Sequence, residues 1–125
     1  MRSRTLRTAL LAGGAYDFVV GLAIVLALRF LSEILPIPFP TEPIYARLCG
    51  VLLLGLAGFY TTTALTLPNS LPSVIAALGI RTLGGLYLAA TPMLHPEAPP
   101  FLAVFGAVDL LFACWLLYGL TVRRP

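Results

Sequence analysis

The sequence predicts an all-α integral membrane protein, a four-helix bundle dissolved in lipid. Of the 125 residues, 59% are hydrophobic and 10% are charged. A soluble domain of this size covers its large surface with roughly 25% charged residues, so the composition is typical of a chain whose solvent is the bilayer. Prolines in clusters and long apolar stretches between them support the same fold class, because they mark where helices end and how far each one runs.

Ten of the eleven prolines form three clusters: Pro36 to Pro43, Pro68 with Pro72, and Pro92 to Pro100. Proline is tolerated between helices or in a first helical turn, because it lacks an N–H and clashes with the preceding turn. The four apolar segments between the clusters are Leu6–Leu31, Ile44–Leu67, Pro72–Thr91 and Pro100–Leu120. Each is long enough, at about 1.5 Å per residue, to cross a hydrocarbon core of about 30 Å. They lack the alternation of a membrane β-barrel, so we expect four transmembrane helices in one domain, residues 1–125.

The arginines predict the orientation of the chain. Arg2, Arg4 and Arg7 precede the first segment, and Arg123 and Arg124 follow the fourth. The loops after the first and third segments contain glutamates but no arginine or lysine. Loops that stay in the cytoplasm collect arginine and lysine, so we expect both termini to be cytoplasmic.

A cleaved signal peptide is the alternative for the first segment. Residues 2–7 would be its basic region, and Ala9–Ala15 would begin its apolar region. However, Asp17 interrupts the apolar run, and hydrophobicity continues to Leu28 without a persuasive small-residue cleavage site. We therefore expect the first segment to be retained as a span.

The two halves of the chain resemble each other weakly. Gly21-Leu22 and Gly85-Leu86 occupy similar places before the two proline-rich outer loops. This similarity predicts a parallel repeat of two helical hairpins.

Three charged residues lie near the middle of the predicted spans: Asp17, Arg81 and Asp109. Each costs about 2.5–3.5 kcal/mol to insert at the bilayer centre, so such residues normally turn inward and meet. Small residues share their helical faces and allow close backbone approach. The expected faces are Gly14, Asp17 and Gly21; Ala77, Arg81, Gly84 and Leu88; and Gly106, Asp109 and Ala113.

We therefore predict an Asp17–Arg81–Asp109 cluster inside the membrane. One guanidinium has five donors in a fork and can serve two carboxylates. A static ion pair that fixes helix packing is the favoured interpretation. The alternative is a role in proton transfer or in gripping a polar ligand group.

A second polar set lies near the outer face and consists of Arg29, Glu33, Glu42 and Arg47, and His95 lies in the outer loop between the third and fourth segments. Arg29 and Glu33 are four residues apart and can pair on one helix face, while Arg47 can reach the headgroups. Interfacial anchoring is the favoured role. The alternatives are that Arg47 grips an anionic lipid or a partner's carboxylate, and that His95 donates to a quinone carbonyl or senses pH.

The remaining residues predict neither a metal site nor a catalytic set. Cys49 and Cys114 differ in depth by roughly 15 Å, beyond the reach of a disulfide, and we expect both to be buried small hydrophobes. Two separated cysteines and one loop histidine do not make a metal or haem site. The spans contain no histidine to act as a base, so a non-enzymatic role is favoured over an enzyme. No cofactor is predicted, and the alternative is a bound quinone or lipid.

The second segment opens with Ala46-Arg47-Leu48-Cys49-Gly50-Val51-Leu52-Leu53-Leu54-Gly55-Leu56, and the third contains Leu78-Gly79-Ile80-Arg81-Thr82-Leu83-Gly84-Gly85. With four short spans, this pattern resembles the DoxX-like group of small bacterial membrane proteins. The resemblance implies a bacterial cytoplasmic (inner) membrane location. Some members resemble membrane partners of quinone-linked redox enzymes, which implies a redox-linked assembly.

Three functions follow from these observations. The leading hypothesis is a non-enzymatic accessory subunit that packs against other membrane chains or copies of itself, with the lipid bilayer as its other partner. A small proton-coupled transporter that uses Asp17 or Asp109 is the first alternative. A binding module or integral-membrane enzyme for a quinone, lipid or isoprenoid, with the polar cluster at the bottom of an apolar pocket, is the second. The composition excludes a free-standing nucleic-acid binder.

Overall fold

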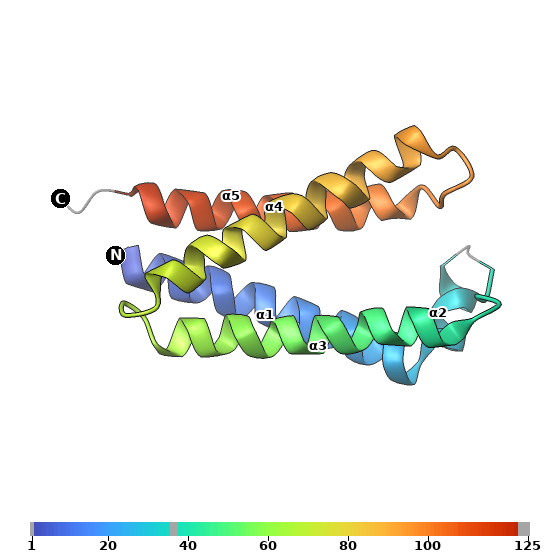
Figure 1. Cartoon of the computed structure of the whole chain (residues 1–125), viewed down its shortest axis with the longest axis horizontal. Coiled ribbons are helices and arrows are strands. Elements are labelled where there is room, and N and C mark those ends of the chain that lie inside the picture. Colours follow the sequence, from blue (N-terminus) through green and yellow to red (C-terminus); the bar gives the residue numbers. More distant parts are fainter. Residues whose placement is uncertain (1, 36–37, 123–125) are drawn as a thin grey trace. The chain divides into compact units, whose positions relative to one another are not determined.

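The computed structural model describes residues 2–35 and 38–122, and within them the regular structure is helical, without strands (Figure 1). The helices are α1 (Arg2–Leu26), α2 (Leu28–Ile34), α3 (Pro43–Leu65), α4 (Leu71–Leu94) and α5 (Phe101–Thr121). All except α2 are long and apolar enough to cross a membrane, so the chain is a multi-pass membrane protein. The basic pair predicted at the C-terminus, Arg123 and Arg124, lies outside the described residues.

Prolines lie at the starts of the helices, as the sequence predicts. Pro43 is the first residue of α3, Pro72 lies in the first turn of α4, and Pro100 caps α5. The third span runs further than expected, to Leu94, and contains Pro92 in its last turn. A proline there removes one hydrogen bond from the end of the helix, where the loss is small.

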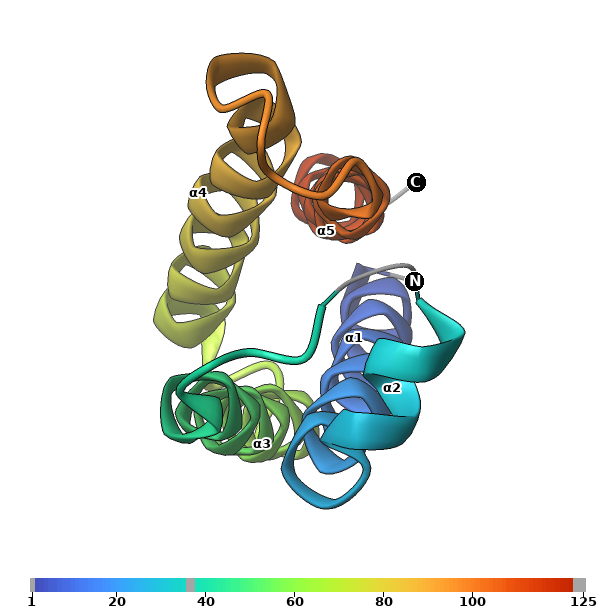
Figure 2. The same cartoon turned by 90° about the vertical axis from the view of Figure 1, so that its right-hand side faces the viewer.

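The first span begins and ends earlier in the chain than predicted. A continuous helix to Leu31 is wrong, because α1 ends at Leu26 and Ala27 leaves helical geometry with φ −129° and ψ 35°. The short α2 follows, set off from the axis of α1 (Figure 2) and held by its one buried residue, Leu28. Neither proline nor glycine lies at the break, so residue type gives no local signal for it.

The chain divides into two compact units, and the first comprises Leu11–Thr62. In this unit α1 and α3 form a hairpin that crosses at Gly21 and Gly50. A methyl group on Gly21 would lie 2.7 Å from the Gly50 carbonyl oxygen, and one on Gly50 would lie 2.9 Å from that of Gly21. The two backbones therefore touch, which requires glycine on both helices.

The second unit comprises Met1–Leu10 with Thr63–Pro125. Here α4 and α5 form a hairpin that crosses at Gly85 and Gly106. A methyl group on Gly85 would lie 3.1 Å from the Gly106 carbonyl oxygen, and one on Gly106 would lie 2.8 Å from that of Gly85. The start of α1 packs on the end of α5, since a methyl group on Gly119 would lie 2.7 Å from Cδ2 of Leu6.

The two hairpins share one internal packing scheme. Adding 64 to the residue number of a buried position on α1 gives a buried position on α4. The matched pairs are Leu10 and Val74, Gly13 and Ala77, Asp17 and Arg81, and Gly21 and Gly85. Adding 56 relates the buried positions of α3 to those of α5 in the same way. The matched pairs are Gly50 and Gly106, Ala57 and Ala113, and Tyr60 and Leu116. The similarity between Gly21-Leu22 and Gly85-Leu86 therefore marks the same crossing point in each hairpin.

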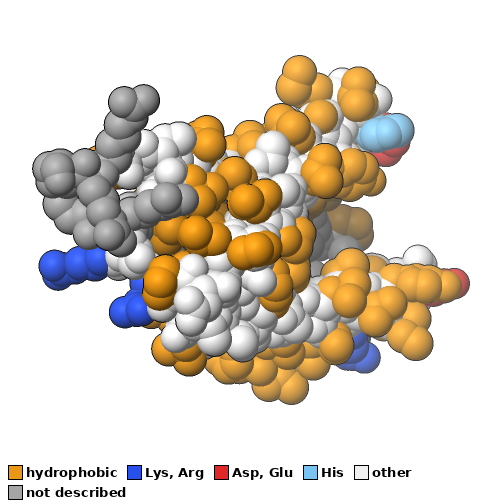
Figure 3. Space-filling model, turned by 60° about the vertical axis from the view of Figure 1, so that its left-hand side comes forward, with side chains coloured by type: hydrophobic (Ala, Val, Ile, Leu, Met, Phe, Trp, Pro, Cys, Tyr) orange, Lys and Arg blue, Asp and Glu red, His pale blue; other side chains and the backbone are white. Residues whose placement is uncertain are grey.

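The outward surfaces of the helices are apolar. Hydrophobic side chains cover much of the face in Figure 3, and in the most apolar stretch of each spanning helix 17% to 33% of residues are buried within the chain. Leu83 (73% exposed) and Leu111 (69%) are examples of these outward apolar side chains.

Candidate functional site

The α4–α5 hairpin contains an ion pair within its membrane-spanning helices. Nη1 of Arg81 donates to Oδ1 of Asp109 at 2.6 Å. The Arg81 side chain is 4% exposed and that of Asp109 is 17% exposed. The guanidinium also lies 5.0 Å from the centroid of the Phe112 ring, one turn along α5 from the carboxylate. The cation therefore contacts an anion and an aromatic face in a low-dielectric setting.

The glycine crossing explains why these two side chains meet. Arg81 lies one turn before Gly85 on α4, and Asp109 lies one turn after Gly106 on α5. Because the helices are antiparallel and touch at the glycines, these two residues come to the same level on facing surfaces. The sequence predicted Gly84 as the close-contact residue of α4, and this is wrong: Gly84 has open space around it, and Gly85 makes the contact.

Asp17, the third member of the predicted cluster, belongs to the other unit. It lies on α1 one turn before Gly21, and it is 1% exposed. The predicted face of Gly14, Asp17 and Gly21 is buried as a whole. The structure thus brings together Arg81 and Asp109, while participation of Asp17 stays a prediction.

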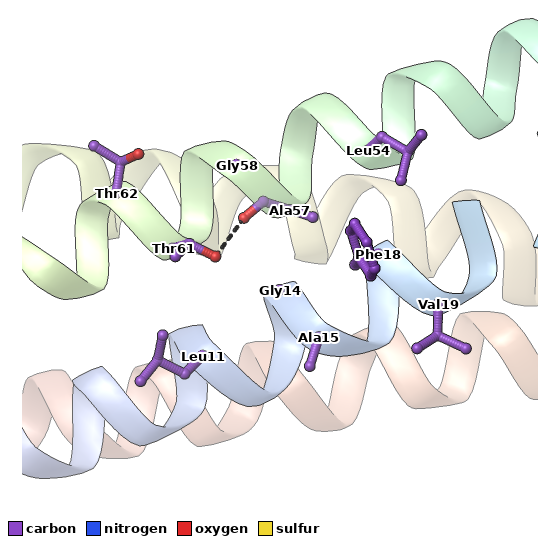
Figure 4. Close-up of a pocket in the computed structure, with 10 residues that line it drawn as sticks. All are labelled: Leu11, Gly14, Ala15, Phe18, Val19, Leu54, Ala57, Gly58, Thr61 and Thr62. Carbon is purple, nitrogen blue, oxygen red and sulfur yellow. Dashed lines mark hydrogen bonds between the residues drawn. The ribbon is translucent and has the colours of Figure 1, made fainter. Parts of the chain in front are cut away.

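A groove within the first unit was not predicted from the sequence. It runs between α1 and α3 and has a volume of about 630 Å³ (Figure 4). Its floor consists of small residues, Gly14 and Ala15 on α1 with Ala57 and Gly58 on α3. The only signal in the sequence is Gly and Ala at helical spacing on two neighbouring spans, and this pattern is too common in membrane helices to single out a groove.

Larger and polar side chains complete the groove. Phe18, Val19 and Leu54 lie at one end, and Leu11, Thr61 and Thr62 lie at the other end (Figure 4). Oγ1 of Thr61 donates to the Ala57 carbonyl at 2.8 Å, the back-bond expected of threonine in an apolar helix.

The predicted outer residues are exposed and dispersed. Arg29 makes no ion pair with Glu33, contrary to expectation; its guanidinium lies 4.6 Å from the centroid of the Phe39 ring. Arg47 is exposed at the start of α3. In the loop between α4 and α5, Nδ1 of His95 lies 3.5 Å from Oε1 of Glu97, and both side chains are well exposed.

The cysteines are placed differently from the prediction. Cys49 and Cys114 are both exposed on the helix surfaces, so their interpretation as buried hydrophobes is wrong. A small apolar thiol is as soluble in lipid as in a protein core, so sequence alone does not distinguish these two positions. Among residues 2–35 and 38–122, no group of three or more His, Cys, Asp or Glu side chains could hold a metal ion.

No family model, curated protein or solved structure matches the chain.

Proposed function

We propose that the chain is a non-enzymatic subunit that packs within a larger membrane assembly through lateral contacts of its helices. The proposal rests on the low burial of the spanning helices. In the most apolar stretch of each one, only 17% to 33% of the residues are buried by the rest of the chain. Helices of a membrane assembly bury their remaining faces against one another by close van der Waals packing. A chain with four open spans and short loops has those faces available for partners.

The ion pair supports a packing role. The Asp109 carboxylate is engaged by Arg81 at 2.6 Å and sits over the glycine crossing, where it locks the register of α4 against α5. A proton-coupled transporter needs a carboxylate that exchanges its proton with substrate, and this geometry gives that alternative less support.

The orientation and location belong to the same proposal. Both termini are cytoplasmic in a bacterial inner membrane, with Arg4 and Arg7 exposed at the start of α1. The packing of Leu6 against Gly119 supports a common side for the start of α1 and the end of α5. The resemblance to the DoxX-like group favours a redox-linked assembly as the setting.

Site-specific photo-crosslinking in native membranes tests the proposal. A benzophenone amino acid replaces Leu83 on α4 or Leu111 on α5, both exposed within spans, and Glu97 in the outer loop is the control position. We expect a discrete crosslinked protein from a span position at native expression, and none from the control. Lipid adducts alone at both span positions, with a single-chain mass for the gently extracted protein, would contradict the proposal.

A further inference from the structure

The short helix α2 (Leu28–Ile34) separates polar and apolar side chains onto two faces. At about 100° of rotation per residue, Arg29, Ser32 and Glu33 fall within one arc of about 100°. The other four residues are apolar and lie on the rest of the circumference: Leu28, Phe30, Leu31 and Ile34. A helix with two such faces is typical of the boundary between hydrocarbon and headgroups, where each face meets the surroundings that suit it.

Packing within the chain covers mainly one edge of the apolar face. Leu28 is the buried residue of α2, whereas Phe30 and Ile34 are 60% and 61% exposed. Phe30 and Ile34 are four residues apart, so they are neighbours on the same side of the helix. Within residues 2–35 and 38–122, these two side chains therefore form an apolar surface that the chain leaves largely uncovered.

The length of α1 places α2 at the edge of the hydrocarbon core. The spanning segment Ser3–Leu26 has 24 residues, which is about 36 Å at about 1.5 Å per residue. A tilt of about 20° leaves about 34 Å along the bilayer normal, more than the core of about 30 Å. The chain then leaves helical geometry at Ala27, and α2 turns away from the axis of α1 (Figure 1 and Figure 2). α2 therefore begins near the level where acyl chains meet headgroups.

Charged groups border the apolar surface of α2. Arg29 and Glu33 are exposed on the polar face, and the Arg29 guanidinium lies 4.6 Å from the centroid of the Phe39 ring. Charged side chains are costly among acyl chains, and large apolar side chains are unfavourable in water. Only the boundary between the two satisfies both faces of α2 at once.

We propose that α2 is an interfacial helix that binds the surface of the bilayer. It lies along the membrane plane, with Phe30 and Ile34 among the upper acyl carbons and with Arg29 and Glu33 among the headgroups. This contact fixes the depth of the α1–α3 hairpin, because a shift outwards exposes Phe30 to water and a shift inwards moves Glu33 into hydrocarbon. The inference does not depend on the proposed subunit function, since it concerns lipid and not a partner chain.

Spin-label depth measurements on the full chain in phospholipid nanodiscs test the inference. The background is Cys49→Ala/Cys114→Ala, which removes both free thiols. Collision of the nitroxide with oxygen and with a water-soluble nickel chelate then gives the depth of each label. The labelled variants of α2 are Phe30→Cys and Ile34→Cys on the apolar face and Arg29→Cys and Glu33→Cys on the polar face.

Two exposed positions outside α2 calibrate the scale. Leu83→Cys on the spanning helix α4 marks the acyl-chain region, and Glu97→Cys in the loop between α4 and α5 marks water. Circular dichroism checks the helix content of every labelled variant. Because each label on α2 replaces a different exposed side chain, the other three native residues keep the helix in place in each measurement.

We expect the labels at positions 30 and 34 to lie about 5–10 Å deeper than those at 29 and 33, and at similar depths to each other. Depths that follow residue number instead of helix face would overturn the inference, because α2 would then stand along the bilayer normal. Nickel accessibility at position 30 equal to that at 97 would also overturn it, since α2 would lie in water. So would shielding of position 30 from both oxygen and nickel, which indicates a protein cover. The presence or absence of a partner in the crosslinking experiment would leave these depths unchanged.

Discussion

Replacing Asp109 with leucine is expected to destabilise the protein by about 3–5 kcal/mol, because it leaves the Arg81 guanidinium buried without its carboxylate. Arg81 is 4% exposed and donates to Asp109 at 2.6 Å, so water has little access to the charge. The variant residue fits the space, since Leu53 occupies the matched position of the first hairpin. The loss therefore reports the stranded charge more than a packing defect.

Unfolding in bicelles with increasing sodium dodecyl sulfate measures this change. Trp115 is the single tryptophan of the chain, and its ring stacks on Phe112 at 6.3 Å between centroids. Because Phe112 lies under the Arg81 guanidinium, the fluorescence of Trp115 reports on the surroundings of the ion pair. Free energies of unfolding within about 0.5 kcal/mol for Asp109→Leu and the unmodified chain would refute the reasoning, because surface pairs contribute in that range.

The double variant Arg81→Met/Asp109→Leu tests whether the ion pair consists of Arg81 and Asp109 alone or belongs to the predicted three-residue cluster with Asp17. If the pair stands by itself, removing both charges should restore stability to within about 1 kcal/mol, because an apolar pair replaces a buried ion pair at little loss. If Asp17 also serves Arg81, the double variant stays destabilised, and adding Asp17→Leu should recover stability. Failure of the triple variant to recover would contradict the three-residue cluster.

Three further outcomes are expected. Gly106→Leu should prevent stable packing of α5, because its Cβ would lie 2.5 Å from the backbone N of Ala89; native-like thermal stability in detergent would contradict the glycine crossing. Gly55→Ala meets no neighbouring atom and should raise stability by about 0.5–1 kcal/mol through helix propensity, measured by the same unfolding titration. In a cysteine-free background, a cysteine at Ala98 should react with an impermeant maleimide added to cells, and one at Ser3 should react after lysis; the reverse pattern would contradict cytoplasmic termini.

The sequence determined the number of spans and most of their ends. Composition requires lipid as the solvent, and proline positions limit where helices can run, so four helices appear within a few residues of the predicted segments. The same local rules placed glycines beside charges, and Gly21 and Gly106 lie at the crossings. These features depend on single residues and their neighbours along the chain, which the sequence shows directly.

The tertiary structure decided which face of each helix packs. In a soluble protein, an apolar stripe marks the buried face of a helix. In lipid both faces are apolar, so the hydrophobic pattern does not show which face packs against another helix. For this reason the sequence did not distinguish Gly84 from Gly85, or show that Cys49 and Cys114 face outward. The groove between α1 and α3 likewise depends on how the side chains of two helices pack together, which neither helix shows by itself.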